Sequence, residues 1–326
     1  MAVMTMVQAI RSALFEEMAR DQRVMVLGQD IARLGGVFRA TEGLLDAYGP
    51  DRVVDTPLAE GVIVGSALGL AVAGMVPVAE IQFLGFAHQA FHQIGPQVGR
   101  FRFRTHGRFG AQVTIRAPFG GGVRAPELHS DALEAQFVQC PGLKVVMPAT
   151  AYDAKGLLLE AIRDPDPVLF CEPLRGYRLV KGEVPDGDYT VPFGQLREAR
   201  RGDHLTLVAW SAAVQIAERA AERLNEESIS AQVLDLRTLV PLDVDGLVSA
   251  VEHTGRCVVV HEAPLSAGFG AEVIATIQEE AFYSLEAPIA RVTAPDTPYP
   301  LAGAEDLYIP TVDRVVDAAR RTVKAG

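Results

Sequence analysis

The chain has 326 residues, of which 49% are hydrophobic and 22% are charged, and its formal net charge at pH 7 is −11. This length and composition are typical of a globular protein with two domains of ordinary size. The acidic balance argues against nucleic acid as the main partner, because phosphate binding requires a basic field. The N-terminus lacks a basic segment followed by an apolar run, so we expect a cytoplasmic protein.

Two further features narrow the class of protein. The most apolar stretch, 62–78, contains several glycines and ends near a proline, which predicts a buried helix and a turn and no membrane span. The three cysteines, Cys140, Cys171 and Cys257, are far apart and have no metal-ligand spacing. We therefore expect each of them to be a small, reduced, buried residue.

In the first half of the chain, apolar residues at helical spacing predict a helix over 6–20 with Thr5 as its N-cap. Short runs rich in β-branched residues predict strands, and amphipathic segments between them predict helices. The predicted strands are 24–27, 53–55, 76–81, 113–115, 144–147 and 168–171. The predicted helices are 41–48, 153–162, one that begins near Glu60 and one that begins near Ser130.

The segment 176–194 is rich in proline, glycine and charge, and predicts a linker or an extended crossing segment. Beyond it the alternation resumes, with strands at 205–210, 231–236, 257–261 and 289–292 and helices at 212–224, 243–253, 270–282 and 311–323. Alternating strands and helices predict an α/β fold of two domains, each a mainly parallel sheet flanked by helices. We place the domains at 1–180 and 197–326, with a linker at 181–196.

Three segments contain residues that could act chemically. In the first, Glu60 begins a glycine-rich helix, where a carboxylate commonly does no more than complement the helix dipole. In the second, Glu80 and Gln82 fall on one side of an extended run, and the aromatic residue Phe86 follows at a strand end where α/β sheets place ligands. In the third, a loop with three consecutive glycines, 120–122, precedes His129, which by itself would most often be a surface residue.

Together these segments are more specific than any one of them. TPLAEGVIVGSALGLA, AEIQFLGF, PELHSD and PGLKVVMPATAYDAKGLL stand in an order that resembles the beta subunits of thiamine-diphosphate-dependent 2-oxo acid dehydrogenases. These proteins are members of the transketolase-like family. The resemblance covers essentially the whole chain. It implies a pyrimidine-binding domain at 1–180 and a transketolase C-terminal-like domain at 197–326.

The resemblance also implies roles for particular residues. Glu60 would share a proton with the pyrimidine ring of thiamine diphosphate, and Leu58, Gln82 and Phe86 would surround that ring. His129 would assist transfer of the acyl group to a lipoyl group. His92 departs from the family, in which an acidic residue is common at this position, and this puts nearby subunit contacts in doubt.

The resemblance implies one metal site in this chain, and the sequence lacks the residues for another. Main-chain carbonyls of Ala161, Ile162, Asp164 and Asp166 match a potassium-binding loop of the family, although a plain helix end with a proline-rich turn explains the same residues nearly as well. The magnesium motif of thiamine enzymes, a GDG segment followed by an Asn pair, is absent. The chain has one Asn, Asn225, and no GDG. We therefore expect a separate alpha subunit to hold the magnesium and the diphosphate.

The expected activity is that of an oxidoreductase of class EC 1.2.4.-, with pyruvate as substrate and branched-chain 2-oxo acids or acetoin as alternatives. The expected partners are the alpha subunit and a second beta subunit in a heterotetramer, and the acyltransferase core with its lipoyl domain. A noncatalytic scaffold with the same fold is the alternative from a different class. The combination of Glu60, Gln82 and His129 argues against it.

Overall fold

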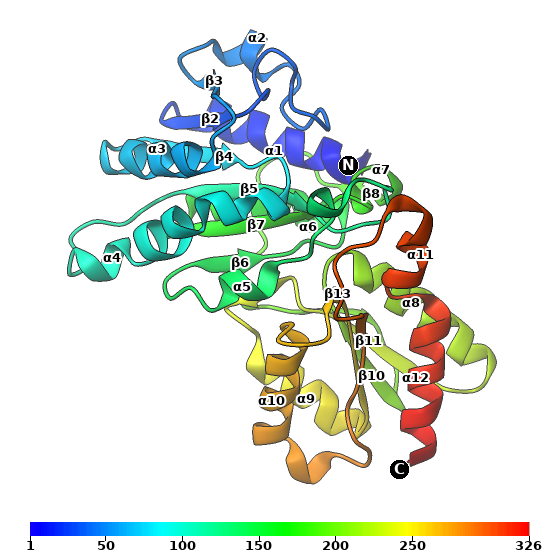
Figure 1. The fold of residues 1–326 in the computed structure, drawn as a ribbon. Helices are drawn as coiled ribbons and strands as arrows, with labels where there is room; N and C mark the ends of the chain where they lie inside the picture. The colour runs from blue at the N-terminus through cyan, green and yellow to red at the C-terminus, as the bar shows by residue number, and fades with distance from the viewer. Residues whose placement is uncertain (326) are drawn as a thin grey trace.

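The computed structural model describes residues 1–325, and its two larger sheets are built mainly from the first and the second half of the chain (Figure 1). The first sheet has the order β12-β6-β7-β5-β4-β2-β3, and all neighbouring strands are parallel except β12 and β6. Its strands are β2 (Val24–Gly28), β3 (Val53–Asp55), β4 (Val76–Glu80), β5 (Thr114–Phe119), β6 (Lys144–Val146), β7 (Val168–Pro173) and β12 (Thr238–Val240).

Helices cover both faces of this sheet because its central strands are apolar on both sides. On one face, α1 (Met6–Arg20) and α6 (Ala151–Arg163) pack on the side chains of Val24 and Val78. On the other face, α3 (Glu60–Val72), the 3-10 helix η1 (Leu84–Ala90) and α5 (Glu134–Val138) pack on Ala79 and Ile115. Shorter helices complete this half, namely α2 (Leu44–Tyr48), the π-helix η2 (Gln93–Gly99) and α4 (Phe101–Arg104).

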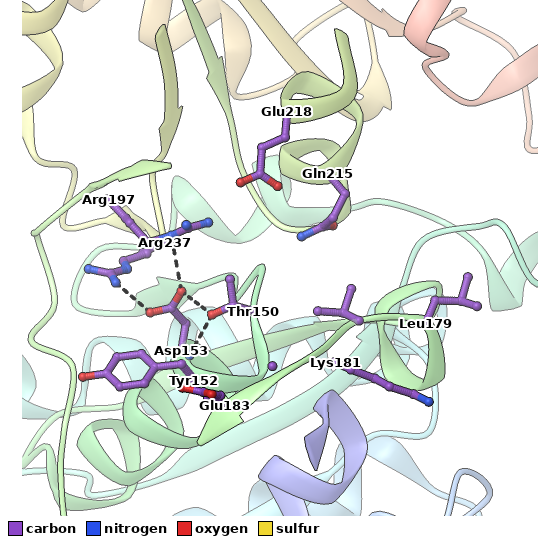
Figure 2. A pocket seen from close by; sticks show the side chains of 12 residues that line it. Thr150, Tyr152, Asp153, Leu179, Lys181, Glu183, Arg197, Gln215, Glu218 and Arg237 are labelled. Atoms are coloured by element: carbon purple, nitrogen blue, oxygen red, sulfur yellow. Dashed lines mark hydrogen bonds and ion pairs between the residues drawn. The ribbon is translucent and has the colours of Figure 1, made fainter. Parts of the chain in front are cut away.

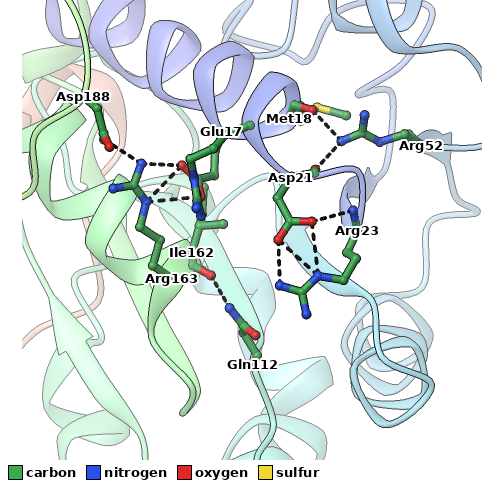
Figure 3. Close-up of polar contacts among 10 residues, drawn as sticks. Glu17, Met18, Asp21, Arg23, Arg52, Gln112, Ile162, Arg163 and Asp188 are labelled. Carbon is green, nitrogen blue, oxygen red and sulfur yellow. Dashed lines mark hydrogen bonds and ion pairs between the residues drawn. The ribbon is translucent and has the colours of Figure 1, made fainter.

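A buried ion pair joins α1 to α6. Glu17 of α1 is fully buried, and its Oε2 accepts a hydrogen bond of 2.7 Å from Nη2 of Arg163 at the end of α6. Figure 3 shows that Arg163 also reaches Asp188, at 2.7 Å. Arg20 donates to Glu17 from the next turn of α1, with Nε at 2.8 Å from Oε1. The burial of a carboxylate is compensated here by two guanidinium groups.

The second sheet has the order β14-β13-β10-β11-β9 and is parallel except for the pairing of β9 with β11. Its strands are β9 (Arg197–Arg200), β10 (Leu205–Ala209), β11 (Ala231–Asp235), β13 (Cys257–Pro264) and β14 (Ala290–Ala294). Helices α8 (Ala212–Glu226) and α12 (Val312–Ala325) cover one face, and α9 (Val244–Thr254) and α10 (Gly270–Glu280) cover the other. The last pair belongs to the same apolar cluster as α3, so one core continues between the halves.

These two sheets with helices on both faces confirm the predicted α/β class. The segment 176–194 is more ordered than predicted, because it contains α7 (Gly176–Leu179) and β8 (Lys181–Val184). Strand β8 pairs antiparallel with β1 (Ala2–Thr5), and β12 from the second half completes the first sheet. The domain boundaries at 180 and 197 stay a prediction.

Two helix predictions were wrong in their bounds. The helix expected near Ser130 begins at Glu134, after the short 3-10 helix η3 (Glu127–His129). The helix expected over 41–48 is only α2, because Gly43 has φ of +85° and interrupts the helical geometry. By contrast, α1 has the predicted bounds, and Thr5 caps it with its side chain.

All three cysteines are buried and free, as predicted. Within residues 1–325, no group of three or more His, Cys, Asp or Glu side chains could hold a metal ion. The same part of the chain has no helix with the length and apolar character that a membrane span requires.

Candidate active site

The predicted residues follow three strands of the first sheet at the same edge. Leu58 and Glu60 follow β3, Gln82 and Phe86 follow β4, and His129 follows β5. Strand β2 pairs in parallel with β3 and β4, and β4 pairs in parallel with β5. The carboxyl ends of parallel strands meet at one edge, which is where open α/β sheets bind ligands.

Glu60 is the first residue of α3, and its side chain is only 8% exposed. Among the described residues no hydrogen bond or ion pair to its carboxyl group is recorded, although buried carboxylates are ordinarily paired. The helix continues close to η1, since a Cβ on Gly61 would lie 3.3 Å from the carbonyl oxygen of Gln89. Glu60 is therefore mostly buried at a helix N-terminus, and its carboxyl oxygens are available to accept a hydrogen bond.

His129 packs edge-on against two phenylalanines. Its ring centroid lies 4.5 Å from that of Phe83 and 5.0 Å from that of Phe86, and Phe83 and Phe86 are 5.7 Å apart. Nδ1 of His129 is buried and has no hydrogen-bond partner within residues 1–325. The structure thus brings His129 and Phe86 together. Phe83 is a member of this cluster that sequence reasoning did not identify.

Leu58 and Gln82 have different surroundings. Leu58 is 70% exposed. Gln82 Nε2 donates to the Gln29 carbonyl at 3.3 Å and to Asp30 Oδ2 at 3.2 Å. These bonds fix the amide of Gln82, and no hydrogen bond joins Gln82 to Glu60 among residues 1–325.

A buried charge network lies beneath the site. Arg116 on β5 donates from Nη1 to Glu80 Oε2 at 2.7 Å and from Nε to Glu172 Oε1 at 2.6 Å, and the Tyr177 hydroxyl also donates to Glu172. Burial lowers the pKa of Arg116, but Glu172 and Glu80 outweigh it and the net shift is upward. Burial raises the pKa of Glu80 against the opposing charge of Arg116. The occurrence of Arg116 inside an otherwise apolar strand was the sequence signal for this network.

The glycine-rich loop is held by carboxylates from the second half of the chain, which sequence reasoning did not predict. Gly122 N–H donates to Glu305 Oε1 at 2.9 Å, and Gly121 N–H donates to Glu262. Burial raises the pKa of Glu262 to about 7. Nearby, Trp210 Nε1 donates to Glu134 Oε1 at 3.2 Å, and burial raises the pKa of Glu134. The loop is therefore part of the contact between the two halves.

A separate cleft of about 640 Å³ also lies between the halves (Figure 2), and none of the predicted site residues lines it. Buried Asp153 of α6 pairs there with Arg237 at 2.8 Å, and Arg197 pairs with Asp235 at 3.2 Å. Mixed charges at this position link α6 to the second sheet, so we interpret the cleft as part of the domain contact.

The loop predicted to bind potassium follows α6. The Ile162 carbonyl accepts a hydrogen bond of 2.9 Å from Gln112 Nε2, which is also visible in Figure 3. Lys144 Nζ lies 2.6 Å from Asp164 Oδ1, and Arg102 pairs with Asp166. Side-chain cations thus pair with both aspartates. The predicted potassium ligands are main-chain carbonyls, which these ion pairs do not test, so the site stays a prediction.

Family models of known proteins match both halves of the chain. Residues 2–179 match the family model described as transketolase, pyrimidine binding domain, and residues 194–315 match transketolase, C-terminal domain. A solved structure titled split gene transketolase, inactive beta4 tetramer, aligns over 99% of both chains with a TM-score of 0.82 and 25% identity. A transketolase from Leishmania mexicana aligns over 99% of this chain and 46% of its own, with a TM-score of 0.71 and 18% identity. The fold and these matches define a transketolase-like protein with a pyrimidine-binding and a C-terminal domain.

Curated relatives narrow the class. Pyruvate dehydrogenase E1 component subunit beta of a Staphylococcus epidermidis strain is 51% identical over 99% of this chain and 100% of its own length. The protein of the same name from Bacillus subtilis is 49% identical over the same shares. The chain therefore belongs to the family of pyruvate dehydrogenase E1 component beta subunits.

Proposed function

We propose that this chain acts as the beta subunit of a pyruvate dehydrogenase E1 component and supplies half of a thiamine-diphosphate site. The observation that carries the proposal is Glu60, a residue only 8% exposed whose carboxyl group makes no hydrogen bond or ion pair among residues 1–325, at the carboxyl-end edge of the first sheet. The family membership and the pyrimidine-binding domain match support the same cofactor.

The residues present fit an aminopyrimidine ring. A carboxyl group can share a proton with a ring nitrogen, and Phe86 offers an aromatic face. The Gln82 amide can donate a hydrogen bond to the edge of the ring or accept one from it. The exposed Leu58 would be covered when cofactor and partner are in place. This support comes from the surroundings of each residue, and the individual roles remain our proposal.

The other half of the site has to come from elsewhere. The chain has one Asn and no GDG segment, so it lacks the usual residues that hold magnesium and a diphosphate. We propose that an alpha subunit provides them in a heterotetramer of two alpha and two beta chains. A lipoyl domain of an acyltransferase core would then receive the acyl group.

The proposed reaction is an oxidative decarboxylation of class EC 1.2.4.-, in which two residues of this chain, Glu60 and His129, would handle protons. Thiamine diphosphate, when bound, supplies the nucleophilic carbon and accepts the electrons released as carbon dioxide leaves. Glu60 would hold a proton at the pyrimidine nitrogen. His129 would give a proton to a sulfur of the dithiolane as the acyl group is transferred.

Pyruvate is the proposed substrate because the relatives near 50% identity carry that name. Branched-chain 2-oxo acids and acetoin are the alternatives that a substrate panel on the assembled enzyme would separate. A potassium ion on the carbonyls of Ala161, Ile162, Asp164 and Asp166 remains a proposal that rests on family resemblance alone. We derive no step from it.

The test is the variant Glu60→Gln, assembled with the alpha subunit. The amide keeps the volume of the side chain but removes its exchangeable carboxyl proton. Hydrogen–deuterium exchange at the reactive carbon of the cofactor should slow by about 10²- to 10⁴-fold, the range typical of acid–base residues. The matched control is Glu272→Gln, because Glu272 is an exposed glutamate in the first turn of α10. Equal exchange rates in both variants would mean that Glu60 does not act on the cofactor and only stabilises the N-terminus of α3 by its charge.

A further inference from the structure

The structure requires glycine at positions 120–122. Gly120 and Gly122 have φ of +82° and +87°, a region that side chains rarely adopt. A Cβ on Gly121 would overlap the Tyr299 hydroxyl group, and one on Gly122 would lie 2.7 Å from Arg175 Cδ. Tyr299 comes from the second half of the chain. The loop is therefore shaped to receive that half closely.

Glu305 is the centre of this contact. Its side chain belongs to α11 (Glu305–Tyr308) and is 1% exposed. Oε1 accepts the Gly122 N–H at 2.9 Å and the Tyr299 hydroxyl at 2.7 Å. The Arg124 N–H lies 3.2 Å from Oε1 and 3.3 Å from Oε2. Hydrogen bonds to a charged acceptor are roughly twice as strong as neutral ones, so one buried carboxylate fixes both loop residues.

The fixed loop leads directly to His129. Arg124, which itself has φ of +56°, is separated from His129 by only four residues. On its other side, η3 rests on η1, since a Cβ on Gly85 would overlap the Leu128 carbonyl. The Arg124 side chain adds bonds of 2.7 Å to the Ala302 carbonyl and 2.8 Å to Asp306. His129 is thus located between a phenylalanine pair and a loop anchored by the second half.

We propose that Glu305 is a positioning residue for acyl transfer, because it fixes the loop 120–124 and through it the imidazole of His129. This inference rests on the proposed role of His129 and goes beyond it by assigning a task in the active site to the C-terminal half. Glu305 touches no substrate. A loss of alignment of about 1 Å can lower a rate by up to about 10²-fold, so a displaced His129 has a measurable effect.

The experiment uses the assembled alpha–beta enzyme and two assays on each preparation. One follows decarboxylation with an artificial electron acceptor, and the other follows acylation of a free lipoyl domain. Glu305→Gln removes the negative charge of the acceptor, and with its amide oxygen in the place of Oε1 its NH₂ group faces the Arg124 N–H in the place of Oε2. We expect kcat for lipoyl acylation to fall on the order of 10-fold, with the KM for pyruvate and the artificial-acceptor rate nearly unchanged.

Two further variants keep the test decisive if Glu305→Gln folds poorly. Gly121→Ala leaves Glu305 intact but forces the loop away from Tyr299, and it should reproduce the same selective defect. Glu280→Gln is the matched control, because it makes the same substitution at an exposed glutamate, at the end of α10 in the same half of the chain. It should behave as the unaltered enzyme does.

His129→Ala in the same assays separates the two proposals. If His129→Ala loses acylation selectively while Glu305→Gln and Gly121→Ala do not, the positioning role is wrong and the role of His129 stands. If His129→Ala leaves acylation intact, both the role of His129 and the inference built on it are overturned. A parallel loss of both activities in Glu305→Gln would mean that Glu305 only holds the domains together.

Discussion

His129 is the residue whose proposed role is most open to a direct functional test. Its Nδ1 is buried without a partner in the described part of the chain, and its ring lies against Phe83 and Phe86. We predict that His129→Ala, assembled with the alpha subunit, retains decarboxylation with an artificial acceptor but acylates a free lipoyl domain about 10²-fold or more slowly. Circular dichroism would verify folding. A parallel loss of both activities would instead assign His129 to substrate binding.

His261 has a different environment and should affect stability rather than chemistry. It is fully buried, stacks on Trp210 with 4.9 Å between ring centroids, and has no partner on either ring nitrogen within residues 1–325. Burial lowers the pKa of His261 to about 3 from its usual 6.5, and the charge of Arg291 adds to the shift. The folded protein therefore keeps this imidazole neutral at pH values at which the unfolded chain takes up a proton.

A depressed pKa in the folded state contributes stability that is fully present above pH 6.5 and is lost as the pH falls toward 3. At pH 5 the loss should be about 2 kcal/mol relative to pH 7.5. We predict that His261→Gln flattens the fall of the unfolding midpoint over this acid range, whatever its effect at neutral pH. His253→Gln, at an exposed histidine, should leave the slope as it is. An unchanged slope in His261→Gln would mean that His261 is protonated when folded.

Among the elements, the packing of α1 on α6 depends on one buried charge. Glu17 is fully buried between Arg163 and Arg20. We predict that Glu17→Ala destabilises the protein by about 2 kcal/mol, because it removes the hydrogen bonds between a buried carboxylate and two partly exposed guanidinium groups. The control on the same helix is Arg11 with Glu42, at 2.7 Å, where the Glu42 side chain is 57% exposed. Glu42→Ala should cost less than about 1 kcal/mol in denaturant unfolding. Equal costs would show that Glu17 is effectively solvated.

Sequence periodicity predicted the long elements well, because each buries one continuous apolar face. The bounds of α1, the start of α3 and the strands β2, β4 and β7 follow from local patterns of this kind. It missed β1, β9 and β12, which are short and obtain their stability from pairing with partners distant in the chain. Pairing between Thr238 and Val146, for example, leaves no mark in the local sequence of either strand.

The candidate site was predicted to a similar extent. Glu60, Gln82 and Phe86 were proposed because they follow strand ends in a recognisable family pattern. The structure places them after β3 and β4 at one sheet edge, and their roles stay a prediction. Phe83 was missed because the alternation of the strand stops at Glu80. Glu262 and Glu305 were missed because they are more than a hundred residues from the loop they bind. No local pattern reports such a contact.

At the scale of the whole molecule, α3 exposes apolar side chains. Leu58 and Val62 are exposed close to Glu60 in the sequence, and Val72 is exposed at the other end of the helix. Such a surface on a helix with small residues at 61, 65 and 69 suits close contact with another chain. This agrees with the absence of a GDG segment from the sequence, and both observations favour a cofactor site shared between two subunits.

The most direct test of this shared site is calorimetry of thiamine diphosphate with magnesium, titrated into the purified chain alone and into the chain mixed with its alpha subunit. We predict no binding at micromolar concentrations to the chain alone and clear micromolar binding to the mixture. Glu60→Gln in the mixture should bind the diphosphate part of the cofactor while exchange at its reactive carbon is slowed. Micromolar binding by the chain alone would contradict the account, because residues of this chain would then suffice to hold both magnesium and diphosphate.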